Sequence, residues 1–165
     1  MMITKSVSFT YKEFANAGEL IPEERELIAE ALRAANNAYA PYSKFRVGAA
    51  LRLESGKIIC GANVENAAFP SGICAERSAV SSAVSNYPHD KPTTIAISAI
   101  NHEGIIEESL SPCGNCRQVI AEEESRSGNK IKIILACRSK IIVFDTISDL
   151  LPLQFNSKNL KINLP

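Results

Sequence analysis

The second half of the 165-residue chain alternates between segments typical of helices and segments typical of strands, and this order restricts the possible folds most. The segments run helix, strand, helix, strand, strand: Cys74–Asn86, Thr94–Ile100, Cys113–Glu124, Ile131–Cys137 and Ile141–Phe144. Strands joined through a helical crossover lie parallel, whereas the short link Arg138-Ser139-Lys140 requires its two strands to be antiparallel. We therefore expect a mixed sheet.

The first half predicts a helix and a hairpin. Pro22 suits the first turn of a helix, which carries an apolar stripe and ends before Pro41. Apolar residues then alternate along Phe45–Leu53, and Ser55-Gly56 turns the chain into a returning strand, Ile58–Val64. The elements together predict an α/β domain with a mixed sheet of about five strands.

The two ends of the chain differ from this middle. Val7, Phe9 and Tyr11 alternate with polar residues, which indicates a short edge strand or an ordered arm. We divide the chain into an arm, residues 1–20, a domain, residues 21–155, and a polar tail, residues 156–165.

Composition excludes several classes of protein. Lys and Arg number 18 and Asp and Glu number 18, so the formal charge of zero disfavours a partner that is a nucleic acid polymer. No apolar run approaches the roughly 20 residues that cross a membrane. The first residues lack the apolar core of a secretory signal, so we expect a cytoplasmic protein whose five cysteines stay reduced. Such thiols suggest metal binding or catalysis before disulfides.

Three of the cysteines are placed to share one metal ion. Cys113 and Cys116 lie three apart in a first helical turn, and Cys74 begins the neighbouring helix. Helix N-termini favour thiolates, and sulfur ligands favour tetrahedral zinc. Three protein ligands leave a fourth position for water, which is typical of catalytic zinc.

Other interpretations of these cysteines exist. Cys113 and Cys116 alone would also fit a redox pair or half of a structural zinc site. A redox pair leaves Cys74 unexplained, and a structural site needs Cys60 or Cys137, which fall in predicted apolar strands. The full pattern favours catalytic zinc.

Catalytic zinc needs a group that moves protons. Glu76 lies two residues from Cys74 and is the candidate general acid and base. By itself, Glu76 would be read as a first-turn glutamate that serves the helix dipole. Arg77 would balance part of the negative charge of three thiolates, although an exposed helix arginine is the plainer reading.

Four motifs resemble the small, homotetrameric cytidine deaminases that act on free nucleosides with one zinc ion per subunit. They occur in that family's order and spacing: Ala40–Leu51, Asn63–Ala67, Cys74–Arg77 and Pro112–Gln118. The resemblance implies a three-layer α/β/α fold with a five-stranded mixed sheet. It also implies hydrolysis of cytidine and 2′-deoxycytidine to uridine, 2′-deoxyuridine and ammonia in pyrimidine salvage.

The resemblance also implies a role for each residue. Cys74, Cys113 and Cys116 hold the zinc, water adds to C4 of cytosine, and Glu76 protonates N3 and then the departing ammonia. Arg77 supports the ligands. The implied substrate contacts are Phe45, Asn63, Glu65, Ala75, Ser111 and Phe155, the last of these reaching a neighbouring subunit's site.

Two other functions compete with this one. A deaminase for a nucleoside-like antibiotic such as blasticidin shares the zinc motifs, but Glu65-Asn66 favours the ribonucleoside. An RNA-binding module with structural zinc is disfavoured by the neutral charge and the few aromatic residues. Many relatives carry Cys where this chain has Ala62, which leaves the three proposed zinc ligands intact.

Overall fold

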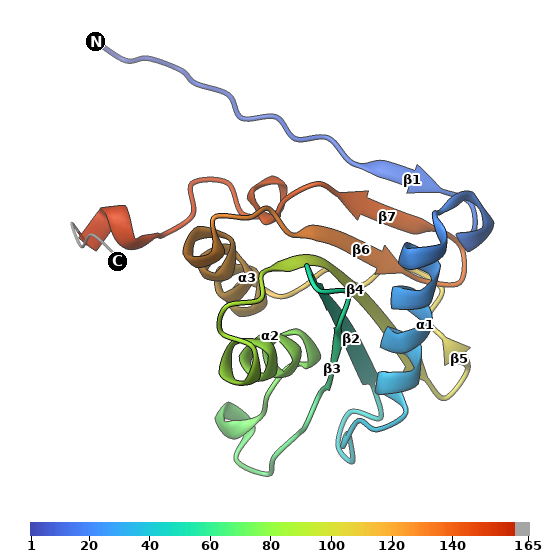
Figure 1. Cartoon of the computed structure of the whole chain (residues 1–165). Helices are drawn as coiled ribbons and strands as arrows, with labels where there is room; N and C mark the ends of the chain where they lie inside the picture. The colour runs from blue at the N-terminus through green and yellow to red at the C-terminus, as the bar shows by residue number, and fades with distance from the viewer. Residues whose placement is uncertain (161–165) are drawn as a thin grey trace.

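The computed structural model describes residues 1–160 and has three layers, with a mixed sheet between one helix and a pair of helices (Figure 1). The helices are α1 (Pro22–Ala35), α2 (Ala75–Asn86) and α3 (Gly114–Ser127). The strands are β1 (Lys12–Phe14), β2 (Arg46–Leu53), β3 (Ile58–Ala62), β4 (Pro92–Asn101), β5 (Gly104–Ile105), β6 (Lys132–Ala136) and β7 (Ile141–Phe144). None of the helices in residues 1–160 is long and apolar enough to cross a membrane.

The predicted α/β class is confirmed, as are three strand pairings. β2 and β3 form the antiparallel hairpin, β4 and β6 are parallel, and β6 and β7 are antiparallel. The strand order is β1-β7-β6-β4-β2-β3, with β5 attached to β4. β2 lies antiparallel to β4, and this pairing joins the hairpin to the parallel strands.

The expected number of five strands is wrong, because the sheet has seven. β1 adds an edge strand from within the arm, where Glu13 pairs with Ile142 of β7. β5 arises because the chain turns back directly after β4, with Gly104 at a φ of 103° that favours glycine. The arm of residues 1–20 is therefore joined to the sheet.

The two faces of the sheet bury different side chains. Alternate residues of each strand point to opposite faces. Leu51 and Ile95 join the core beneath α2 and α3, whereas Ala50 and Ile134 join the core beneath α1. The central strands are buried on both faces, as expected for strands covered by helices on both sides.

Two glycines let the helices lie close to the sheet. A Cβ atom at Gly61 of β3 would collide with the backbone of α2 at Ala75 and Ala79. Gly48 of β2 meets the backbone of α1 in the same way. Gly61 thus fixes the depth at which the first turn of α2 lies.

The topology brings the starts of α2 and α3 together. β3 and β4 both run antiparallel to β2, so they run in the same direction. α2 follows β3 and α3 follows β4, and the two helices lie side by side on one face (Figure 1). Their N-termini consequently meet at one edge of the sheet, where parallel α/β proteins bind ligands.

Candidate active site

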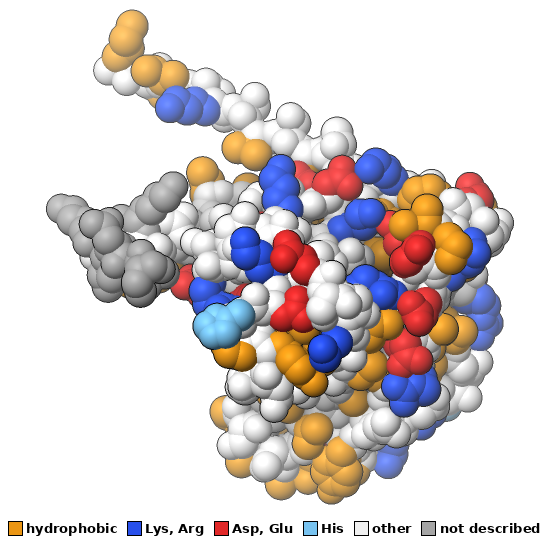
Figure 2. Space-filling view, in the orientation of Figure 1, with side chains coloured by type: hydrophobic (Ala, Val, Ile, Leu, Met, Phe, Trp, Pro, Cys, Tyr) orange, Lys and Arg blue, Asp and Glu red, His pale blue; other side chains and the backbone are white. Residues whose placement is uncertain are grey.

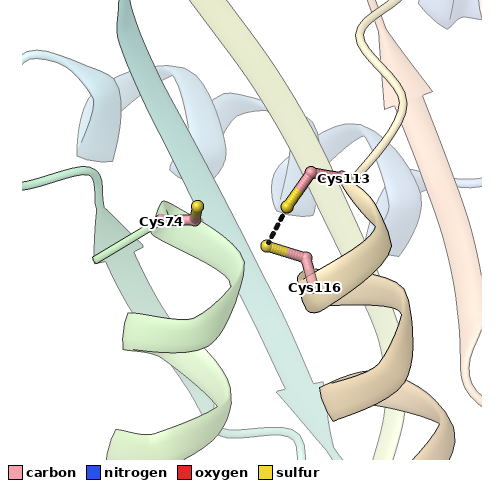
Figure 3. A group of neighbouring side chains, drawn as sticks. All are labelled: Cys74, Cys113 and Cys116. Atoms are coloured by element: carbon pink, nitrogen blue, oxygen red, sulfur yellow. Dashed lines mark hydrogen bonds between the residues drawn. The ribbon is translucent and has the colours of Figure 1, made fainter. Parts of the chain in front are cut away.

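Three thiols converge where these two helices begin (Figure 3). Cys74 and Cys113 are the N-cap residues of α2 and α3, and Cys116 lies in the first turn of α3. The three sulfur atoms lie within 4.8 Å of one another, and Sγ of Cys113 is 3.5 Å from Sγ of Cys116. The structure therefore brings together the three residues predicted to hold zinc.

The chemistry of this cluster fits a zinc ion. Burial raises the pKa of Cys74 and, strongly, that of Cys116. At Cys113 burial acts in the same direction, but hydrogen bonds with Cys116 and Asn115 outweigh it and lower the pKa of the thiol. Two helix N-termini favour negative charge here, and a bound cation favours thiolates further.

The other two cysteines lie elsewhere and do not supply a fourth ligand. The thiol of Cys60 lies 3.7 Å from the Glu30 carboxylate, on the side of the sheet covered by α1. The thiol of Cys137 lies 3.2 Å from the Lys140 carbonyl in the turn between β6 and β7. In the part of the chain described, the thiol cluster thus offers three ligands, which leaves a tetrahedral ion one open position.

Glu76 lies next to the thiol cluster and is only 5% exposed. Burial raises the pKa of Glu76, and hydrogen bonds with its own backbone and with Cys116, together with the charge of Arg77, offset part of this effect. A carboxyl group with a raised pKa accepts and releases protons near neutral pH more readily than an exposed one. The raised pKa is the direction expected for the predicted role of Glu76 as acid and base.

Arg77 ties the start of α2 to the preceding loop. One of its guanidinium nitrogens donates a hydrogen bond to the Gly72 carbonyl at 3.0 Å, and the buried Nε has no protein partner. Its positive charge helps to lower the pKa of both Cys74 and Glu76. This direction agrees with the predicted charge-balancing role.

A cavity of about 700 Å³ opens above the cluster, within the usual size range for small-molecule sites. Cys74, Glu76 and Cys113 contribute to its lining. Five of the six predicted substrate contacts also line it: Phe45, Asn63, Glu65, Ala75 and Ser111. Phe155 does not line it, and this side chain is 56% exposed.

Asn63 and Glu65 both support the cavity wall. The Asn63 side chain accepts a hydrogen bond from Val47 N–H at 2.7 Å and donates one to the Phe45 carbonyl at 3.0 Å. The Glu65 carboxylate accepts bonds from the hydroxyl of Ser43 and from the backbone N–H groups of Tyr42 and Ser43. The Ser43 hydrogen bond lowers the pKa of Glu65, which keeps the carboxylate ionised.

Sequence reasoning assigned no role to several residues near the site. The rings of Tyr42 and Phe69 meet edge to face, 5.7 Å apart, and both line the cavity. Arg117 donates hydrogen bonds to the Pro112 and Leu150 carbonyls, each at 2.7 Å. Tyr42 and Arg117 fall inside the motifs Ala40–Leu51 and Pro112–Gln118, so their position in those motifs was the available signal.

Three thiols with an open metal position and a buried carboxylate, at the floor of a cavity, define a zinc-dependent hydrolase. Residues 22–128 match the family model described as "Cytidine and deoxycytidylate deaminase zinc-binding region". The chain belongs to the cytidine deaminase family. It is accordingly a zinc-dependent deaminase.

Relatives with known names agree with this assignment. The chain is 38% identical over 138 residues to a cytidine deaminase of Halalkalibacterium halodurans, covering 84% of this chain and 98% of the relative. Its fold is similar to the crystal structure of cytidine deaminase from Burkholderia pseudomallei, with a TM-score of 0.67 and 38% identity over 79% of this chain and 97% of the other. A blasticidin-S deaminase of Bacillus cereus is 31% identical over 68% of this chain and 79% of its own length.

Proposed function

We propose that this protein converts cytidine and 2′-deoxycytidine, with water, to uridine or 2′-deoxyuridine and ammonia, as a step of pyrimidine salvage. The observation that carries the proposal is the position of Glu76, a buried carboxylate beside three thiols at a cavity of about 700 Å³. Neutral overall charge supports an uncharged nucleoside over a nucleotide.

The predicted site residues each have a place in this reaction. Cys74, Cys113 and Cys116 would hold the zinc, which would supply a Lewis acid and lower the pKa of a bound water toward about 7. Glu76 takes the proton released from water and delivers it to N3 of the base. It then takes the proton of the new hydroxyl group on C4, which becomes the carbonyl, and passes it to the departing amino group, which leaves as ammonia. Backbone groups at Ala75 and Ser111 hold the edge of the base, and Phe45 packs against the nucleoside.

An absorbance assay with purified, zinc-loaded protein tests the proposal. The long-wavelength ultraviolet absorbance of cytidine and 2′-deoxycytidine should fall as uridine and 2′-deoxyuridine form. The protein should bind about one zinc ion per chain. Blasticidin S and single-stranded RNA serve as comparison ligands. If blasticidin S were turned over and the two nucleosides were not, the protein would be an antibiotic deaminase. If it bound RNA and turned over none of these compounds, it would be an RNA-binding module.

The resemblance implies that Asn63 and Glu65 hydrogen-bond the ribose 3′-hydroxyl. We predict that Glu65→Ala raises KM and lowers kcat/KM for cytidine by about tenfold or more, because this charged hydrogen bond to the sugar is lost. Free cytosine, which has no sugar, should lose much less. Glu54→Ala, in the turn between β2 and β3, is the matched control. Equal losses on cytidine and cytosine would mean that Glu65 only holds Tyr42 and Ser43 in place.

The proposal also covers the number of subunits and the part of the chain that forms the deaminase domain. We propose a homotetramer built from the domain of residues 21–155, in which Phe155 contacts a neighbouring subunit's site. Two facts support this: Phe155 is exposed outside its own cavity, and its carbonyl accepts a 2.8 Å hydrogen bond from Gln118 of α3. A cytoplasmic location stays a prediction from the sequence of the first residues. The last residues of the tail, 161–165, lie outside the described structure.

A further inference from the structure

The first eleven residues form an extended arm that projects from the body of the molecule (Figure 1). Their apolar side chains are largely exposed: Val7 is 66%, Phe9 53% and Tyr11 52% exposed. The rings of Phe9 and Tyr11 lie 6.5 and 5.6 Å from the ring of Phe144 of β7. Figure 2 shows apolar side chains far out along this arm, away from the main surface. An exposed apolar segment of this kind is typical of an interaction site.

The arm continues directly into an unpaired sheet edge. β1 pairs with β7 along one side, and its other side is the outer edge of the sheet. Within residues 1–160, the arm upstream of β1 pairs with no strand of its own chain. Extended backbone at a free edge is a template for pairing with another strand. The arm also lies outside the matched deaminase region, residues 22–128, so it is an addition to that region.

We propose that residues 4–14 of two copies of this chain pair antiparallel around a twofold axis at Phe9, which joins the two sheets into one. A twofold interface brings the same patch of each copy together. In this register Phe9 lies opposite Phe9 of the partner subunit, and Val7 lies opposite Tyr11 of the partner subunit. The exposed apolar side chains thereby cover one another as cross-strand pairs.

Charge complementarity selects this register. With the axis at Phe9, Lys5 lies opposite Glu13 of the partner subunit, and these are the charged residues of that face between residues 4 and 14. Glu13 has a half-exposed carboxylate that already binds Lys140 at 3.1 Å, so one oxygen remains for a second cation. An axis at Val7 would place Lys5 against Phe9, and an axis at Ser8 would place it against Tyr11.

Cysteine cross-linking of the full-length, zinc-loaded chain tests the pairing. Phe9→Cys places two thiols opposite each other, so mild oxidation should give a disulfide-linked dimer. Ser8→Cys is the matched control, because residue 8 lies opposite Thr10 of the partner subunit and its thiols are displaced from each other. The unchanged chain gives the background from its own cysteines. The proposal is overturned if Phe9→Cys cross-links no faster than Ser8→Cys.

A charge exchange tests the register. Lys5→Glu should weaken the association through the arms. The concentration at which the arm-paired assembly dissociates, measured by sedimentation, should rise at least tenfold. Adding Glu13→Lys together with Lys140→Glu, which keeps the ion pair within the chain, should restore the association, because the pair between the copies is re-formed with its signs exchanged. Failure to recover would overturn the register. Deaminase activity should be unchanged throughout, so the result is independent of the proposed reaction.

Discussion

Glu76→Gln should lower kcat for cytidine by about 10³-fold or more while the protein keeps its zinc. The amide has the shape of the carboxyl group but neither accepts nor releases a proton at neutral pH, and positioned proton transfer contributes about 10²–10⁴-fold to a rate. Because Glu76 is not one of the three thiol ligands, the metal content should stay near one ion per chain. The measurements are kcat from absorbance and zinc by elemental analysis.

Glu122→Gln, on the exposed face of α3, is the control for this variant. It should have the activity and zinc content of the unchanged protein. Undiminished uridine production by Glu76→Gln would reject the proposed mechanism. Loss of zinc along with activity would show instead that the carboxylate supports the metal site.

Cys116→Ala should remove both the zinc and the activity. Cys116 is fully buried and supplies one of three ligands, so we expect zinc affinity to fall by at least about 100-fold. A ligand present at 100 times its Kd stabilises the folded state by about 2.7 kcal/mol, and the variant loses this stabilisation. Thermal unfolding with and without a chelator measures the effect: chelation should lower the Tm of the unchanged protein but not that of the variant.

The chain offers matched controls in its remaining cysteines. Cys60→Ala and Cys137→Ala remove thiols that lie away from the cluster, so both variants should retain zinc, activity and the response of Tm to the chelator. If Cys137→Ala lost zinc as completely as Cys116→Ala, the proposed ligand set would have to be revised.

Local signals in the sequence were sufficient for the helices and the hairpin. Pro22 is the first residue of α1, and Cys74 and Cys113 are the N-caps of α2 and α3. Proline constrains the local backbone, so the effect of Pro22 can be read without knowledge of the tertiary structure, whereas the side chains of Cys74 and Cys113 make no capping hydrogen bond. The parallel pairing of β4 and β6 likewise follows from the length of the connection between them.

Strands at the edges were harder to predict, because their limits depend on a partner. The alternation at Val7, Phe9 and Tyr11 predicted a short edge strand or an ordered arm there, and the strand that forms, β1, begins only at Lys12. In the register of β1 with β7, Tyr11 lies opposite Phe144, where β7 ends. Residues before Tyr11 therefore have no strand beside them, although their sequence pattern is that of a strand.

For the candidate site, spacing identified the metal cluster but not the support around it. Two cysteines three apart on a helix share a face wherever that helix lies. The bonds from Asn63 to the backbone of Phe45 and Val47, and from Tyr42 and Ser43 to Glu65, join segments about 16 to 23 residues apart in sequence. Such contacts depend on how the hairpin and its loops pack together.

The close contact of Gly61 with α2 has a consequence for protein engineering. Any side chain at residue 61 would push the helix that carries Cys74 and Glu76 away from the sheet, and overpacking of this kind usually costs about 1–3 kcal/mol. Tyr42 and Phe69, in contrast, are exposed at the mouth of the cavity and can change in size without moving that helix. Directed evolution toward bulkier nucleoside analogues should therefore select substitutions at these two aromatic residues and retain glycine at position 61.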